Sequence, residues 1–551
     1  MTGRRVSGPT ETEKELQKED EAGRTGSRGR IVMLVDNMVE RDSRVQKQAM
    51  YAAAAGWEVH LIGFHRGKKK KRWTLGEANV MLVPLGEVLN KPKYRPLRSM
   101  VRRPLAYGHP DIAVYRRRLV QSRRAELSAS RLEPRAAGQV RKTWLLGRRV
   151  AAKVQQKWVG LRARQTDSLT AARNSQQSPL ERFMVAVWLK LLGDRAWRVL
   201  DRGMWDWEAA YGKVIDELEP DIIHGNDFRM LAIGARATLR ARARGRQVKF
   251  VWDAHEYLPG VRWNNPPRWH PAMIAMEREY APVADAIVTV SEPLAEWLVE
   301  EHGLKRKPAV VLNAPVTDVE VSADQPVPDM REMCGIDADT PLAVYSGGAT
   351  KQRGLDIIIE TLPRLPGLHV ALIVPSSRAD YVKALMNRAE ELDVRDRVTL
   401  LPFVPFDQVV PFLSAADFGI HPLHHLPNHE IALATKFFEY AHARLPIVVS
   451  DVKAMSDVVK ETGHGEVFKA EDEDDFVRAV TAVMQNLKRY RDVYDERPDL
   501  LHQWTWPAQA EILDGVYTEL LPSSARPSAA KTSSEKTSSQ KTSSQKTSDH
   551  E

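Results

Sequence analysis

The sequence contains little of what cross-links a protein or anchors it in a membrane. A single cysteine, Cys334, stands among 551 residues, so no disulfide can form within the chain, which fits a reducing compartment. No apolar run reaches the roughly 18 residues of a membrane-spanning helix. The longest candidate begins at Phe183 and contains Lys190. The N-terminus lacks the apolar segment of a secretion signal. We therefore expect a cytoplasmic protein.

Acidic residues are scarce in one segment. Between residues 91 and 198 stand about 26 Lys and Arg against about 6 Asp and Glu, an excess near +20, whereas the whole chain carries +9. The remainder is therefore acidic, at about −11. Such an uneven distribution indicates a surface that faces anions.

Within this basic segment, the spacing predicts a helix over 140–164. Its apolar side chains fall within one broad stripe, and Lys and Arg fill the other face: Trp144, Leu145, Val150, Val154, Trp158 and Leu161. Such a helix suits an anionic membrane surface. It could equally pack on the protein with a basic outer face, or contact a partner. Nucleic acid is the least favoured partner, because no nucleic-acid-binding signature accompanies the charge.

Both ends of the chain are polar. Residues 1–28 are charged and poor in apolar side chains, and residues 523–551 repeat KTSS-type units without apolar content. Neither end can bury enough apolar surface to fold, so both are expected to be disordered.

The first half alternates buried strands with helices. A strand over 30–36, a helix over 44–56 and a strand over 57–64 form one βαβ unit, which implies a parallel sheet. Further strands are expected near Asn79 and within 220–227, 248–255, 284–291 and 309–315, and a helix over 180–218. This pattern predicts a doubly wound α/β domain.

Ligands of such sheets bind at the carboxyl ends of the strands. In the first half, polar residues lie at or after the carboxyl ends of three predicted strands. We take six of them as site candidates: Asn37, Arg44, Asn226, Asp227, His255 and Glu256. For Arg44, an ordinary ion pair is the alternative.

The second half begins after a predicted linker over 316–330. The stretch PLAVYSGGATKQRGLD runs from a strand into Gly347 and Gly348 and then a helix, where a phosphate could approach the backbone near Lys351 and Arg353. The stretch ATKFFEYAHARLPIVVSD places Lys436 and Glu439 three residues apart on one helix face. A cation and a carboxylate there suit a ligand with a phosphate and a sugar diol. A solvated ion pair is the alternative.

These motifs, in this order, resemble the retaining glycosyltransferases of family 4, which have a GT-B fold. No single motif is decisive, and the resemblance rests on the order and spacing of these stretches together: DSRVQKQAMYAAAAGWEV, PDIIHGND, WDAHEYLPG, ADAIVTVSE, VVLNAP, YSGGATKQRGLD and TKFFEYAHARLPIVVSD. It implies two doubly wound Rossmann-like domains that face a cleft. Residues 29–315 would bind the acceptor and carry a basic helical insert at about 90–200. Residues 331–522 would bind a nucleotide sugar.

The resemblance also implies roles for individual residues. Glu439 would hold the donor ribose, Lys436 would lie near the donor, and Arg353 would face the diphosphate. Gly347 and Gly348 would form the turn beneath it, beside Lys351. Three residues are the catalytic candidates: His255, Asp227 and Glu430. Four are placed on the acceptor side: Asn37, Arg44, Asn226 and Glu256.

The implied activity is transfer of a hexose or related sugar to a glycan or lipid-linked acceptor, in cell-envelope polysaccharide or glycoconjugate synthesis. No metal or other cofactor is implied. The protein would lie in the cytoplasm, peripheral to the inner face of the membrane.

Two alternatives remain. Gly348 and Asn226 stand where relatives commonly carry a basic residue and a histidine, which leaves room for a non-catalytic GT-B scaffold. A nucleotide-sugar 2-epimerase has the same fold, but the basic insert and the K-x-x-E-Y pattern argue against it.

Overall fold

The computed structural model of the chain describes residues 27–40, 42–86, 89, 103–129, 139–175, 179–261, 268–317 and 326–522. The predicted disordered segments, except for residues 27 and 28, lie outside the described residues. Residues 318–325 of the predicted linker also lie outside the described residues.

The first half forms an eight-stranded sheet in the order β3-β4-β2-β1-β5-β6-β7-β8, with every neighbouring pair parallel except β3 and β4. Its strands are β1 (Arg30–Leu34), β2 (Glu58–His65), β3 (Lys71–Leu75), β4 (Ala78–Pro84), β5 (Ile222–Asn226), β6 (Lys249–Ala254), β7 (Ala286–Thr289) and β8 (Ala309–Val310). The strand order runs outward in both directions from β1, with β2 on one side and β5 on the other. This reversal defines a doubly wound sheet.

Helices cover both faces of this sheet. Alternate residues of β1 join different cores: Val32 and Leu34 lie in one hydrophobic cluster, whereas Ile31 and Met33 lie in another. The helices and short helical turns are α2 (Ser43–Ala54), α5 (Pro179–Leu192), η4 (Gly193–Ala196), α6 (Trp197–Leu200), α7 (Met204–Leu218), α8 (Asp227–Ala243), η5 (Leu258–Gly260), α9 (Trp269–Tyr280), η6 (Ala281–Val283) and α10 (Glu292–His302). The predicted α/β domain is confirmed.

The second half forms a six-stranded, fully parallel sheet in the order β11-β10-β9-β12-β13-β14. Its strands are β9 (Leu342–Ser346), β10 (His369–Ile373), β11 (Val398–Leu401), β12 (Phe418–His421), β13 (Ile447–Ser450) and β14 (Gly465–Phe468). The two domains therefore repeat one topology, with β1 and β9 in equivalent positions.

Helices flank this second sheet as well, and they fall into hydrophobic clusters on its two faces. The elements are α11 (Met330–Cys334), η7 (Lys351–Arg353), α12 (Leu355–Thr361), η8 (Leu362–Arg364), α13 (Asp380–Glu391), η9 (Arg395–Arg397), η10 (Phe406–Gln408), α14 (Val409–Leu413), α15 (Pro427–Glu430), α16 (Thr435–His442), α17 (Lys453–Thr462), α18 (Glu473–Gln485), α19 (Leu487–Glu496) and α20 (Pro498–Gln503). They are followed by the last helix, α21 (Trp506–Leu520).

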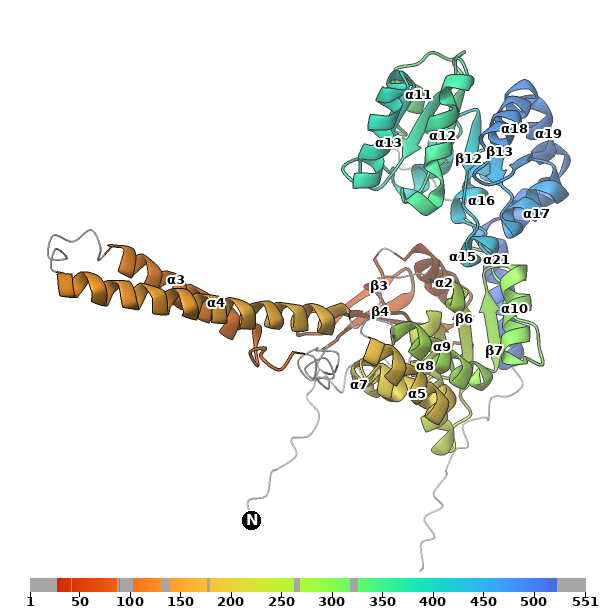
Figure 1. Cartoon of the computed structure of the whole chain (residues 1–551). Coiled ribbons are helices and arrows are strands. Elements are labelled where there is room, and N and C mark those ends of the chain that lie inside the picture. The colour runs from red at the N-terminus through yellow and green to blue at the C-terminus, as the bar shows by residue number, and fades with distance from the viewer. Residues whose placement is uncertain are drawn as a thin grey trace, which may run out of the picture.

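The last helix returns to the first domain. Trp506, Leu513 and Tyr517 of α21 are buried in the same cluster as Ile31 and Met33. At the crossing, the Trp506 amide donates to the Pro315 carbonyl, at 2.8 Å. Figure 1 shows α21 beside α10, below the C-terminal domain. The chain therefore passes twice between the domains.

The predicted insert forms a long arm of two helices, α3 (Pro110–Ala129) and α4 (Gln139–Ser175). At 1.5 Å per residue, α4 is about 55 Å long. Figure 1 shows the arm projecting sideways from the N-terminal domain. None of the helices in the described part of the chain is both long and apolar enough to cross a membrane.

Three expectations need correction. The helix predicted over 180–218 is broken, because Gly193 takes a left-handed φ of 52° and Asp201 ends α6. Its buried residues Val185 and Trp197 belong to the N-terminal core, so the projecting part of the insert ends at Ser175 rather than near residue 200. The antiparallel strand β3 was missed, since Lys71 and Arg72 give it little apolar character.

Candidate functional site

The candidate residues lie at the carboxyl edges of both sheets, and contacts between the segment after β6 and the residues around α15 join these edges. The Tyr257 amide, three residues beyond β6, donates to Asn428 Oδ1 of α15 at 2.9 Å. Ile431 also packs against the N-terminal core. The site candidates of the two domains therefore border one interdomain region.

Asp253 lies at the centre of the N-terminal part of the site. It is fully buried at the end of β6, where three side chains lie within about 3 Å of its carboxylate and His224 Nε2 lies farther away, at 3.8 Å. Arg44 Nη2 lies 3.0 Å from Oδ1, while Gln48 Nε2 and His255 Nε2 lie 2.5 Å and 3.0 Å from Oδ2. Burial opposes ionisation, but Arg44 and His255 outweigh it and hold the pKa of Asp253 well below its usual range. Sequence reasoning missed Asp253, although it stands two residues before His255.

Asp253 and Arg44 fix the orientation of His255. Arg44 Nε lies 3.1 Å from His255 Nε2, and Arg44 Nη1 donates to the Val311 carbonyl at 2.8 Å. Burial lowers the pKa of His255, but the Asp253 carboxylate outweighs burial, so the pKa is raised overall. Arg44 is only 4% exposed and holds His255 in place, and it also lines the cavity beside the loop between β1 and α2.

Asp227 is the first residue of α8 and has a left-handed φ of 68°, a conformation that Asp tolerates better than most residues. Burial raises the pKa of Asp227 to about 7; His255 opposes this, and the neighbouring Asp36 and Glu256 add to it. Burial likewise raises the pKa of Glu256, and Asp36 adds to it. His255, Asp36 and Glu256 thus all act on the Asp227 carboxyl, and Asp36 itself forms an ion pair with Arg229 at 2.6 Å.

Asn226 and Asn37 have contacts within the domain. Asn226 is fully buried and donates to the Leu34 carbonyl at 3.1 Å, so it ties β5 to β1. Asn37 donates to Asp42 Oδ2 at 2.7 Å and accepts from the Val39 amide at 2.7 Å, which closes the loop between β1 and α2.

A cavity of about 640 Å³ opens beside this loop. Asp36, Asn37, Met38, Phe64 and Arg66 contribute to its walls. Because it adjoins the carboxyl end of β1 and has both apolar and charged walls, it is the candidate acceptor space of the N-terminal domain.

Lys436 and Glu439 form a close ion pair on α16, with 2.5 Å between Nζ and Oε2. Burial raises the pKa of Glu439, and Lys436 and Lys47 counteract that effect. The next residue, Tyr440, accepts from the Ser346 amide at 2.8 Å and so attaches α16 to the end of β9. The spacing of these residues within α16 thereby places the pair beside the glycine turn.

The glycine turn after β9 leads directly to Arg353. Tyr345 donates its hydroxyl to the Gly348 carbonyl at 2.7 Å, and Lys351 is exposed in η7. Gly354 has a φ of 67°, and a Cβ there would lie 2.0 Å from the Pro422 carbonyl oxygen, so only glycine fits. The backbone is thus fixed beside Arg353.

Positive charge gathers around His421, which is fully buried at the end of β12. Burial lowers the pKa of His421 to about 3, and Arg353, His429 and Lys436 lower it further. The His424 amide, just beyond β12, donates to the Gln352 carbonyl at 3.2 Å, and α16 packs on β12, so Arg353 and Lys436 both border the end of this strand. Such an arrangement suits an anionic ligand.

Lys47 of α2 links the two halves of the site. Its ammonium donates to the Ala314 carbonyl at 2.6 Å and lies 4.5 Å from the centre of the Trp506 ring, so it contacts both interdomain crossings. Burial and then Arg44 lower the pKa of Lys47 to about 7, while Glu439 of the other domain opposes this. Sequence reasoning missed Lys47, because its helical position resembles that of an ordinary surface lysine.

Glu430 has two local contacts. Its Oε1 lies 2.6 Å from His425 Nδ1, and its Oε2 accepts from the Lys453 amide at 2.9 Å, at the start of α17. The structure therefore places Glu430 at a helix N-terminus, where a carboxylate is stabilising.

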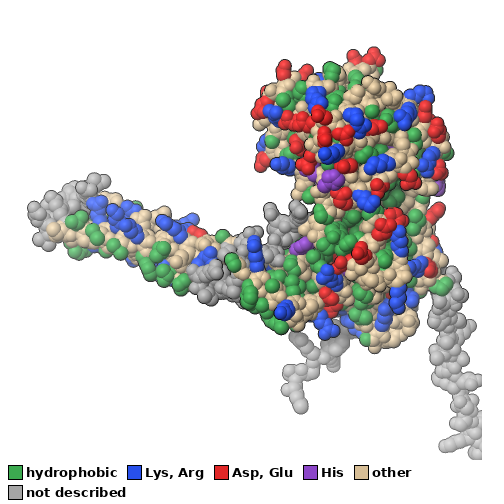
Figure 2. All heavy atoms as spheres, turned by 45° about the vertical axis from the view of Figure 1, so that its right-hand side comes forward, with side chains coloured by type: hydrophobic (Ala, Val, Ile, Leu, Met, Phe, Trp, Pro, Cys, Tyr) green, Lys and Arg blue, Asp and Glu red, His purple; other side chains and the backbone are tan. Residues whose placement is uncertain are grey.

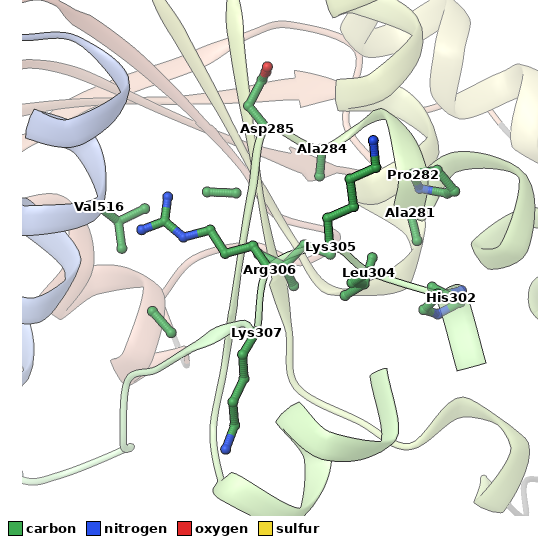
Figure 3. A pocket seen from close by; sticks show the side chains of 14 residues that line it. Ala281, Pro282, Ala284, Asp285, His302, Leu304, Lys305, Arg306, Lys307 and Val516 are labelled. Carbon is green, nitrogen blue, oxygen red and sulfur yellow. The ribbon is translucent and has the colours of Figure 1, made fainter. Parts of the chain in front are cut away.

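A second cavity lies away from this region. Figure 3 shows its basic loop of Lys305, Arg306 and Lys307, with Val516 of α21 opposite. The cavity measures about 440 Å³ and lies at the amino ends of β7 and β8, which is the edge of the sheet opposite the candidate site. Within the described residues, no group of three His, Cys, Asp or Glu could hold a metal ion.

Two Rossmann-like domains with their carboxyl edges turned toward each other define the GT-B class of glycosyltransferase folds. Comparison with solved structures agrees: sucrose-phosphate synthase from Thermosynechococcus elongatus matches with a TM-score of 0.57 at 13% identity, over 89% of this chain and 99% of that structure.

Sequence comparisons identify the family. The family model for group 1 glycosyl transferases matches residues 327–497, and the model for glycosyltransferase family 4 matches residues 169–318. Together the two matches span more than half of the chain, which belongs to the family 4 glycosyltransferases. The predicted fold and family are confirmed.

Two relatives show how far the likeness extends. An uncharacterized glycosyltransferase of Methanocaldococcus jannaschii is 23% identical over 302 residues, covering 54% of this chain and 75% of the relative. The D-inositol 3-phosphate glycosyltransferase of Mycolicibacterium smegmatis is 24% identical over 210 residues, covering 38% of this chain and 47% of the relative. The chain thus matches about half of the length of the second relative.

Proposed function

We propose that this protein transfers a hexose or related sugar from a nucleotide sugar to a glycan or lipid-linked acceptor, with retention of configuration at the anomeric carbon. The observation that carries the proposal is the gathering of Arg353, Lys436 and Glu439 at the carboxyl edge of the C-terminal sheet. This cluster has the charges that a nucleoside diphosphate requires. Family membership supports the same reaction class.

The C-terminal domain would hold the donor. Glu439 would accept hydrogen bonds from the ribose hydroxyls, while Lys436 and Arg353 would neutralise the diphosphate. Lys351 is exposed in η7 and would add positive charge at the outer edge of the donor site. The turn at Gly347 and Gly348 lets the phosphate approach the backbone. The burial that raises the pKa of Glu439 also strengthens each hydrogen bond that it accepts.

The reaction exchanges one bond at the anomeric carbon for another. The bond to the diphosphate oxygen breaks, and the acceptor hydroxyl oxygen bonds to the same face of the sugar. The hydroxyl proton passes to the departing diphosphate. Arg353 and Lys436 stabilise the charge that develops on the diphosphate. His255, held by Asp253, and the carboxyl of Asp227 would face the sugar from the N-terminal domain.

The acceptor would enter through the cavity beside the loop between β1 and α2. Its size and mixed walls suit a sugar with an apolar or charged extension. The expected setting is synthesis of cell-envelope polysaccharide or glycoconjugate in the cytoplasm, at the inner face of the membrane. We propose no metal or other cofactor for the reaction.

The proposal is tested by a thermal-shift screen of nucleoside diphosphates and nucleotide sugars, followed by donor-turnover and product-configuration assays. A bound donor should raise the melting temperature by mass action. Arg353→Gln and Glu439→Gln should each lose the shift and lower kcat/KM by about 10²–10³, as expected for removal of one charge-stabilising group. NMR of the product should show the donor's anomeric configuration.

Arg364→Gln is the matched control, since Arg364 is a partly exposed arginine of the same domain that pairs with Asp474. It should bind and turn over donor as the unchanged protein does. The absence of a shift with every donor would contradict the proposal and favour a non-catalytic scaffold. An inverted product would overturn the retaining mechanism alone.

A further inference from the structure

The arm is an antiparallel pair of helices held together along a single seam. Buried side chains recur every seven residues on each helix: Ala113, Val120 and Leu127 on α3, and Leu145, Ala152 and Val159 on α4. Seven-residue spacing keeps these side chains on one face of each helix. The seam therefore uses only one face of α4 and leaves the opposite face without a packing partner in the described structure.

That opposite face carries an apolar stripe. Leu146, Val150, Val154 and Trp158 follow at intervals of four residues and are 60%, 57%, 63% and 49% exposed. Leu161 extends the same stripe and is 44% exposed. Leu145, predicted from sequence to share one stripe with Val150 and Trp158, instead belongs to the seam. An apolar row of this length is seldom left to water without a binding role.

A basic groove runs beside the stripe. It encloses about 400 Å³ between α3 and α4, and five cations contribute to its walls: Arg117, Arg124, Lys153, Lys157 and Arg164. Lys153, Lys157 and Arg164 each stand three residues after a stripe residue, namely Val150, Val154 and Leu161. Residues three apart are neighbours on a helix surface, so the groove and the stripe share a border.

The charge of the arm selects among possible partners. Its described residues, 103–129 and 139–175, include fifteen Lys and Arg but only Asp111, Glu126 and Asp167 as acids. This charge opposes association of two arms. Nucleic acid could bind the groove but would leave the stripe in water. An anionic lipid surface satisfies both features, since phosphates meet the cations and acyl chains meet the stripe.

We propose that the α3–α4 arm is a docking surface for an anionic phospholipid leaflet, with lipid headgroup phosphates in the groove and the stripe at the boundary of the acyl chains. Figure 2 shows the division on the arm: basic side chains gather along one side and apolar side chains along the other. The projection of the arm from the body leaves this surface clear of both domains (Figure 1). Docking does not depend on the transfer reaction proposed above.

Sedimentation of the full chain with phosphatidylcholine vesicles, with and without phosphatidylglycerol, tests the inference. We expect binding only when phosphatidylglycerol is present, and weaker binding at high salt. Lys153→Gln with Lys157→Gln should weaken binding roughly thirty-fold, from about fivefold per basic residue. Val154→Ser with Trp158→Ser should also weaken binding while leaving the groove charges in place.

Arg364→Gln with Lys383→Gln is the control, because it removes the same charge from exposed positions of the C-terminal domain. This control should bind as the unchanged chain does, and all variants should melt at similar temperatures. Equal loss in the control, or no binding to anionic vesicles, would overturn the inference. Binding of RNA without vesicle binding, or a concentration-dependent dimer without vesicle binding, would assign the arm to another partner and equally overturn it.

Discussion

At the scale of single residues, Asp253 holds the N-terminal part of the site together. It is the buried counter-charge of Arg44, and it also contacts Gln48 and His255. A buried ion pair adds little stability over an apolar pair, but the loss of one partner leaves the other charge in a medium that cannot solvate it.

Asp253→Asn should therefore lower the free energy of unfolding by about 3–5 kcal/mol, because Arg44 would remain buried without its counter-charge. Urea denaturation measures the change. Glu301→Gln, which breaks the more exposed pair with Arg278, should cost less than about 1 kcal/mol. Equal losses in the two variants would show that Arg44 finds solvent or another partner.

Asp227 makes stability depend on pH. Because burial raises its pKa from 3.8 to about 7, the folded protein keeps the proton where the unfolded chain has lost it. Its contribution to stability is present below about pH 4 and is lost as pH rises through 7. Asp227→Asn mimics the neutral form and also tolerates the left-handed φ.

At pH 4 we expect Asp227→Asn to have the same melting temperature as the unchanged protein. At pH 8 its melting temperature should be higher. Differential scanning calorimetry at both values checks the sign. A variant that is less stable than the unchanged protein at pH 8 would mean that Asp227 is stabilised as the carboxylate.

At the scale of elements, the turn between β9 and α12 couples backbone geometry to donor binding. Gly354→Ala would place a Cβ against the Pro422 carbonyl and force a left-handed alanine, which costs about 1–2 kcal/mol for the backbone alone. It should also displace Arg353 and weaken nucleoside diphosphate binding by at least tenfold, an effect of about 1.4 kcal/mol.

Gly335→Ala is the matched control for this turn. Gly335 has a φ of 68° but open space around its added Cβ. Gly335→Ala should lower the free energy of unfolding by a similar amount, because its backbone is also left-handed. Its nucleotide affinity, measured by calorimetric titration, should stay unchanged. If both variants bind nucleotide normally, the position of Arg353 does not depend on Gly354.

At the scale of the whole molecule, the N-terminal domain is completed by the C-terminal helix. Leu513 of α21 is buried in the cluster that contains Ile31 and Met33. Tyr517 in the same helix contacts His224 Nδ1 at 2.6 Å. The stability of one domain thus depends on residues that follow the other domain in sequence.

Leu513→Ala should cost about 2–5 kcal/mol, as is usual for a leucine truncated in a core. Native-state hydrogen exchange should show lower protection of β1 and β5 but unchanged protection of β9 and β12. Leu385→Ala, in the core of the C-terminal domain, should give the reverse pattern. Loss of protection in both sheets from either variant would show that the two domains unfold as one unit.

Local sequence patterns determined much of this protein. Buried runs such as Ile31–Leu34 and Ile447–Val449 specify parallel strands, because both faces of such strands are covered. The order of the motifs specified the family, and the spacing of Lys436 and Glu439 specified their pairing on α16. These features depend on neighbours in sequence, so they can be recognised without the fold.

Only the tertiary structure decided which residues meet across long separations. Arg44 and Asp253 are 209 positions apart, and Lys47 touches both crossings between the domains. The same holds for the arm, where packing against α3 buried Leu145 and left Val150 and Trp158 exposed. Helical periodicity shows that a face is apolar, but it cannot show which side a neighbouring helix will cover. That choice depends on contacts between segments distant in sequence.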